Sequence, residues 1–101
     1  MQATVTKDGA KALITLAGRF DFNTHREFRG AYEPLMAEAG IKSVVVDFTN
    51  VDYLDSSALG MLLMLRDKMG GVGKEISLSG VRGNVKQVLD IATFANFFPL
   101  C

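Results

Sequence analysis

The chain has 101 residues, and its length, composition and charge limit what it can be. Its 49% hydrophobic and 22% charged residues are typical of one soluble globular domain, which at this length can fold without disulfides or metal. Eleven basic residues balance eleven acidic ones, which excludes the broad positive charge used in non-specific binding to nucleic acids or anionic membranes. We therefore expect a protein partner, with no cofactor and no metal.

Two absences bear on where the protein works. The single cysteine, Cys101, can form neither an intramolecular disulfide nor a zinc site by itself. Residues 1–20 show no basic start followed by a long apolar run, and no stretch reaches the roughly 18 apolar residues that a bilayer requires. These features predict a cytoplasmic protein.

The first third of the chain predicts a hairpin and a helix. Residues 4–6 and 11–16 are short β-rich runs on either side of Asp8-Gly9, a dipeptide that favours a tight turn. Between residues 23 and 39, apolar side chains recur at intervals of three and four, the period of an amphipathic helix. A glycine and a proline inside this segment weaken the helix or bend it.

The rest of the chain alternates predicted strands and helices. Residues 43–48 are almost continuously apolar and β-branched, as expected of a central strand, and residues 56–69 form a second helix. Residues 75–79 predict another strand and residues 84–92 a third helix. The aromatic segment 94–100 is too apolar to be left in water, so we expect it to fold back onto the domain.

The order β-β-α-β-α-β-α implies a single α/β domain over residues 1–101, with a roughly four-stranded mixed sheet packed with helices. Strand–helix–strand crossovers make neighbouring strands parallel. Three connections, at residues 18–23, 49–57 and 80–84, then leave the carboxyl ends of strands at one edge of the sheet. Sites of α/β folds usually lie at this edge.

One stretch carries a recognisable signature. Residues 44–63 resemble the signature of STAS domains of the anti-sigma factor antagonist class, and the centre of the match is Asp55-Ser56-Ser57-Ala58-Leu59-Gly60. The segments Gly18-Arg19-Phe20-Asp21 and Phe97-Phe98-Pro99-Leu100 are similar to two further motifs of that family. The chain departs from the family at Ala58, where many members have glycine.

The resemblance implies a bacterial regulator and not an enzyme. In the family, the second hydroxyl residue of the box is phosphorylated by a dedicated serine kinase and dephosphorylated by a serine phosphatase, and this position is Ser57. Unphosphorylated, such a domain binds an anti-sigma factor or a related serine-protein kinase, and phosphorylation releases it. The final client, a sigma factor or another output such as a second-messenger enzyme, is left open.

The residues around Ser57 support a switch on physical grounds. A serine in the first turn of a helix lies at the positive end of the helix dipole, so the fold tolerates a phosphate there. Asp55 or Ser56 is expected to cap this helix, with Ser56 the more structural of the two serines. Asp52, Asp55 and Asp21 make the expected surface acidic, so the added charge changes partner choice.

The helix after the box predicts a docking face. It is apolar nearly all round, more than one core-facing stripe requires. Ser57, Met61, Met64 and Lys68 fall at spacings of four, three and four, and so share one face. The predicted partner-binding residues are Asp21, Asp55, Ser56, Ser57, Met61, Met64, Lys68 and Arg82. The ordinary alternatives are helix caps for the polar residues of the box and Asp21, core packing for the methionines, and surface solvation for Arg82.

Two other functions remain open. A STAS subunit of a larger assembly, such as a transporter, would use the same helix as a constitutive interface. A small serine hydrolase would use Ser57, His25 and Asp21 as a triad, but the chain has no Gly-x-Ser-x-Gly elbow. The glycine-rich segment 70–75 is no phosphate loop, because Lys74 is followed by glutamate and the segment joins a helix to a strand.

Overall fold

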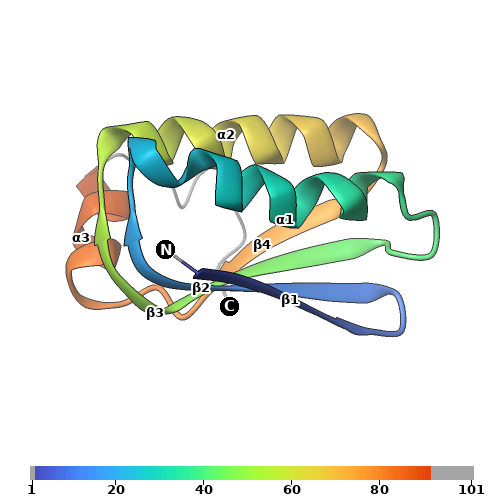
Figure 1. Cartoon of the computed structure of the whole chain (residues 1–101), viewed down its shortest axis with the longest axis horizontal. Coiled ribbons are helices and arrows are strands. Elements are labelled where there is room, and N and C mark those ends of the chain that lie inside the picture. The colour runs from blue at the N-terminus through green and yellow to red at the C-terminus, as the bar shows by residue number, and fades with distance from the viewer. Residues whose placement is uncertain (1, 92–101) are drawn as a thin grey trace.

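The computed structural model describes residues 2–91 as a four-stranded sheet with helices against it (Figure 1). The elements, in chain order, are β1 (Gln2–Asp8), β2 (Lys11–Phe20), a 3₁₀ turn η1 (Phe22–Thr24), α1 (His25–Ala37), β3 (Ser43–Leu54), α2 (Ser56–Gly71), β4 (Glu75–Ser79) and α3 (Gly83–Ile91). The predicted fold class and element order are confirmed. The expectations for Ala92 and for the aromatic segment lie outside the described residues.

The sheet is mixed, with strand order β1-β2-β3-β4. β1 pairs with β2 antiparallel, whereas β2 with β3 and β3 with β4 are parallel. Asp8 pairs with Lys11, so the hairpin loop is Gly9-Ala10, one residue later than the sequence suggested. Gly9 has a φ of +61°, which glycine adopts without strain.

α1 and α2 cover one face of the sheet, and the core lies between them and the strands (Figure 1). Alternate residues of the strands point into this core, as the period of two requires. On β2 and β3 they are Ala12, Ile14, Leu16, Val44, Val46 and Phe48, all almost completely buried. The helices contribute buried side chains to the same core: Phe28, Tyr32 and Leu35 from α1, and Leu62, Leu65 and Met69 from α2.

Both inner strands are longer than the sequence suggested. β3 was expected to end at residue 48 and the connection to follow it, but the strand continues to Leu54. Its last part pairs with the end of β2, which itself runs past Gly18 to Phe20. The sequence did not predict this last part of β3 because residues 49, 50 and 52 are polar and exposed. Val51 and Leu54 are buried and pack this part of the strand against the core. Gly18 lies at a register shift and has a φ of +95°, as a glycine at a β-bulge does.

This long parallel pair fixes where the two covering helices begin. Phe20 pairs with Leu54, and each is followed directly by an aspartate that caps a helical turn. The amide of Asp55 donates to the carbonyl of Phe20 at 3.3 Å, across the two strand ends. α1 and α2 therefore start next to each other and run side by side in the same direction over the sheet (Figure 1).

The loop after β4 is tied to the extended part of β3. Asp47 Oδ1 accepts from the amide and the hydroxyl of Thr49, at 3.0 and 2.6 Å. Arg82 donates to the Thr49 carbonyl at 2.8 Å. Gly80 packs directly against this turn with a φ of +65°, and a Cβ there would meet Thr49 Oγ1 and come within 2.6 Å of the Thr49 nitrogen.

Replacing Gly80 therefore tests this junction. We expect Gly80→Ala to lower the free energy of unfolding by about 3 kcal/mol or more, because strain at positive φ adds to a clash with backbone. The matched control is Gly73→Ala, where φ is +73° but a Cβ meets nothing within 4 Å, so only about 1 kcal/mol of strain is expected. Urea denaturation of both variants measures the difference, and equal losses would contradict the close packing of Gly80 on Thr49.

Candidate functional site

The predicted box forms the start of α2. Asp55 is the N-cap, and its Oδ1 accepts from the amide of Ala58 at 2.9 Å. Of the two residues expected as a cap, Asp55 therefore performs this role, and Ser56 is the exposed first residue of the helix. Ser57 is the second residue, half-buried, with its side chain on the wall of a groove. The hydroxyl thus lies at the positive end of the α2 dipole.

Asp21 has the same capping role on the neighbouring strand. Its Oδ1 accepts from the amide of Asn23 at 3.0 Å, while its own amide donates to the Thr24 hydroxyl, which completes a capping box. Arg19 Nε lies 3.6 Å from Asp21 Oδ2, and the Arg19 guanidinium stacks 4.2 Å from the centre of the Tyr53 ring. The structure therefore places Asp21 beside the box, with its carboxylate engaged in local contacts.

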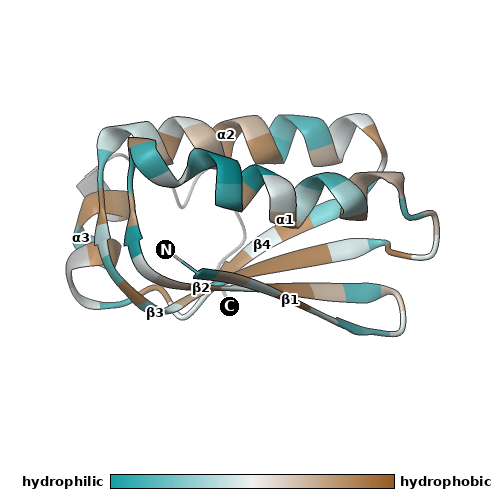
Figure 2. Cartoon of the chain, viewed as in Figure 1, coloured by the Kyte–Doolittle hydropathy of each residue, from teal (hydrophilic) through white to brown (hydrophobic). Residues whose placement is uncertain are grey.

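A groove of about 430 Å³ runs between α1 and α2. Its α2 wall carries Ser57, Gly60, Met61, Met64 and Lys68. The four side chains that sequence spacing assigned to one face therefore line one groove. Met64 is 54% exposed, whereas Met61 is half-buried and packs against the core. In Figure 2 the middle of α2 is hydrophobic (brown) and is followed by a hydrophilic (teal) segment before the helix ends.

The sequence did not predict the α1 wall of the groove. This wall carries Phe22, His25, Phe28, Arg29 and Tyr32. Phe28 and Tyr32 are buried and form its floor, but Phe22 is 68% exposed and stacks loosely on His25, with ring centres 6.2 Å apart. The sequence did contain one signal for this wall, the aromatic residue Phe22 directly after Asp21. Only the packing of α1 beside α2 shows that Phe22 lines the groove.

The groove is bordered by cations. Arg29 Nε donates to Glu33 Oε1 at 2.8 Å, and this hydrogen bond, together with the charge of Glu33, raises the pKa of Arg29 above its ordinary value. Lys68 Nζ lies 5.8 Å from the centre of the Tyr32 ring. Among the described residues that line the groove there is no carboxylate. Asp21 and Asp55, which were expected to make the surface around Ser57 acidic, cap η1 and α2 and do not line the groove.

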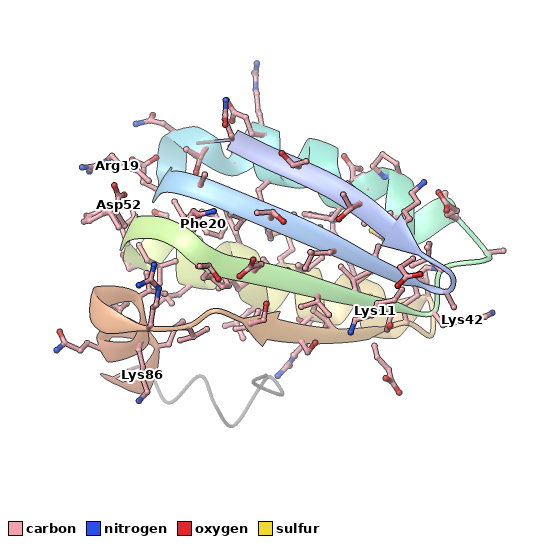
Figure 3. The ribbon with its side chains drawn as sticks, turned by 90° about the horizontal axis from the view of Figure 1, so that it is seen from below. Lys11, Arg19, Phe20, Lys42, Asp52 and Lys86 are labelled. Atoms are coloured by element: carbon pink, nitrogen blue, oxygen red, sulfur yellow. The ribbon has the colours of Figure 1, made fainter. Side chains whose placement is uncertain are left out.

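Two of the expected edge residues lie away from the groove. Arg82 is exposed, donates to the Thr49 carbonyl of β3, and is not among the residues that line the groove. Asp52 is an exposed residue of β3, and Figure 3 places it with Arg19 at the end where β2 and β3 finish. Neither residue is brought into the groove that contains Ser57.

The arrangement lacks the contacts of a hydrolytic triad. Ser57 and His25 line the same groove, but in residues 2–91 no hydrogen bond joins the hydroxyl to the imidazole, and the Asp21 carboxylate binds the Asn23 amide. The same part of the chain contains no group of three or more side chains suited to hold a metal ion. None of its helices has the length and apolarity needed to cross a membrane.

Comparison with known proteins decides the family. The family model described as "Mlab, STAS domain" matches residues 3–99, almost the whole chain. The chain belongs to the STAS-domain family. A STAS-domain containing protein of Pseudomonas aeruginosa is 44% identical over 98 residues, covering 97% of this chain and 95% of that protein. BtrV, a candidate anti-sigma factor antagonist of Bordetella bronchiseptica, is 29% identical over 63 residues, covering 62% of this chain and 54% of BtrV.

Solved structures share the STAS fold at low sequence identity. An anti-sigma factor antagonist from Mycobacterium paratuberculosis has a TM-score of 0.85 at 18% identity, with 98% of this chain and 83% of that chain covered. The anti-sigma factor antagonist SpoIIAA, unphosphorylated, has a TM-score of 0.80 at 15% identity, with 98% and 87% covered. A sulfate transporter family protein from Wolinella succinogenes has a TM-score of 0.74 at 18% identity, with 87% and 70% covered. The resemblance to anti-sigma factor antagonists is confirmed.

The exposure of the methionines gives a direct test of the groove. We expect Met64→Lys to change the free energy of unfolding by less than about 0.5 kcal/mol, because the side chain is largely in solvent. Met69→Lys, on the buried side of the same helix, should destabilise by about 4 kcal/mol or more. Thermal and urea unfolding compare the two, and loss of the folded state in Met64→Lys would show that Met64 belongs to the core.

Proposed function

We propose that this STAS domain is a partner-switching regulator controlled by phosphorylation of Ser57. Unphosphorylated, it binds an anti-sigma factor or a related serine-kinase-type switch protein at the α1–α2 groove, and phosphorylation releases that partner. A dedicated serine kinase adds the phosphate and a serine phosphatase removes it, in the cytoplasm. The observation that carries the proposal is the position of Ser57, in the first turn of α2 and on the wall of an open apolar groove.

The proposed chemistry follows from where Ser57 lies. A phosphate brings about −1.5 to −2 charges and three acceptor oxygens to the mouth of the groove. The helix dipole of α2 favours this charge, so the fold is retained. For a partner already seated on Phe22 and Met64, however, the dianion must be desolvated in an apolar contact, which is costly. The neighbouring side chains of His25 and Arg29 also become hydrogen-bond donors to the phosphate and are then lost to the partner.

The comparisons support this function over catalysis. STAS-domain proteins of known fold include anti-sigma factor antagonists, and SpoIIAA has been solved in an unphosphorylated and a phosphorylated form. In this chain Asp55 caps α2 through Ala58, which leaves Ser57 without a capping role. Of the residues proposed for partner binding, Ser57, Met61, Met64 and Lys68 line the groove. Asp55 and Ser56 precede Ser57 at the start of α2, and Asp21 precedes Phe22 at the start of η1. Arg82 is a less direct candidate, since it is held by Thr49.

A constitutive role in a larger assembly is the second candidate. It is favoured by the fold shared with the sulfate transporter family protein. In that role the same groove holds a subunit of the assembly permanently, and Ser57 needs no modification. The two functions differ in whether phosphorylation changes affinity.

Phosphorylation should lower partner affinity by about 2 kcal/mol or more, roughly thirtyfold, for the reasons of charge and desolvation given above. The test is calorimetric titration of the anti-sigma factor of the same organism with protein carrying phosphoserine at position 57, and with unmodified protein, at one salt concentration. Ser57→Ala is the binding-competent control, and it should fold normally because Asp55 provides the cap.

Ser56→Ala is the matched variant for the neighbouring hydroxyl. The kinase should phosphorylate Ser56→Ala but not Ser57→Ala. Continued phosphorylation of Ser57→Ala would assign the switch to Ser56. Equal affinities of the two forms, or tighter binding by the phosphorylated one, would contradict partner release and support the constitutive assembly.

A further inference from the structure

We infer that the α1–α2 groove receives an amphipathic helix of the partner, with apolar anchors facing Gly60 and Met64 and an acidic side chain at Lys68. The inference rests on the proposed function only in taking this groove as the partner's site. It adds the chemistry of the partner, which the phosphorylation scheme leaves open.

The shape of the groove fits a helix. α1 and α2 run side by side in the same direction, and a third helix packs in the valley between two such helices. The α2 wall extends from Ser57 to Lys68, which is about 16 Å or three helical turns. Apolar groups are exposed on both sides, since Phe22 is 68% and Met64 54% exposed. These are contacts that an apolar helix face buries on binding.

Gly60 leaves room for an apolar anchor of the partner. It lies between Ser57 and Met64 on the groove wall, and a Cβ built on it meets nothing within 4 Å. A glycine inside a helix lowers helix stability by about 1 kcal/mol relative to alanine, and at Gly60 the missing side chain leaves open space on the groove wall. An apolar side chain of the partner fills the space above it, next to the buried rings of Phe28 and Tyr32.

The charge of the groove selects an acidic partner. The lining contains His25, Arg29 and Lys68 but no carboxylate. Arg29 forms an ion pair with Glu33, whereas for Lys68 no carboxylate among the described side chains lies within ion-pair distance of its Nζ. Lys68 is half-buried and directed over Tyr32, so its ammonium group borders apolar surface. A partner carboxylate there gains a partly desolvated ion pair, and a partner cation is rejected.

The direct test selects binders without assuming the partner. A displayed library of random peptides of about 15 residues, long enough for four helical turns, is panned against the unphosphorylated full chain. The enriched sequences should carry apolar residues at helical spacing and an Asp or Glu next to the last anchor. Enrichment of sequences without an acidic residue, or with basic residues at that place, would overturn the inference.

Matched variants of the protein show whether the tightest-binding peptide occupies the groove. Gly60→Leu should weaken it by about tenfold or more by filling the groove, whereas Gly30→Leu should not. Gly30 is an equally open helical glycine, but it lies on α1 outside the groove. Lys68→Glu should weaken the peptide about fivefold or more, and a peptide with Lys in place of its acidic residue should regain affinity for Lys68→Glu but not for the unchanged protein.

The outcomes separate this inference from the proposed switch. If the acidic peptide binds the groove but phosphoserine at position 57 leaves its affinity unchanged, the switch fails and the inference stands. If no peptide depends on Gly60 and Lys68 while phosphorylation still releases the anti-sigma factor, the inference fails and the switch stands. Self-association that is lost in Gly60→Leu, with no such peptide, would assign the groove to a second copy of the chain and also overturn the inference.

Discussion

The parallel pairing of β2 with β3 is the constraint on which the rest of the structure depends. The two strands stay paired as far as Phe20 and Leu54, whereas β4 pairs with β3 only as far as Asp47. At their ends the Asp55 amide donates a hydrogen bond to the Phe20 carbonyl. Because both strands end together, the aspartates that follow them cap two helical segments at the same place. The bulge at Gly18 supplies the register shift that this alignment needs.

The groove is a consequence of that alignment. Two helices that begin together and cross the same sheet face leave a valley between them, and the first turn of α2 places Ser57 at its mouth. The core takes one stripe of α2, which includes Leu62 and Leu65, whereas Met61 and Met64 line the valley. In the proposed function, regulation and recognition therefore share one surface. A phosphate at Ser57 would change the charge of that contact area without disturbing the core that supports it.

The sequence predicted the fold and one wall of the candidate groove. The periodicities gave the strands and helices, and the spacing of Ser57, Met61, Met64 and Lys68 gave one wall of the groove. The ends of β2 and β3 were missed, since polar residues such as Asn50 and Asp52 alternate there with apolar ones and a glycine interrupts β2. The α1 wall was missed because it depends on how two helices lie against each other, which no local pattern contains. The sequence predicted a cap at Asp55 or Ser56 and left a capping role open for Asp21, and the backbone geometry assigns the caps to Asp55 and Asp21.

The most direct test of the account follows the methionine methyl groups by NMR, in protein with and without phosphoserine at position 57. The chain has five methionines, and three of them lie on α2 at graded depth. On addition of the anti-sigma factor to the unphosphorylated protein, the methyl signals of Met61 and Met64 should shift while that of buried Met69 should not, and phosphorylation should suppress the shifts. Unchanged Met64 and Met61 signals on a complex that forms, or equal shifts in both phosphorylation states, would contradict the account.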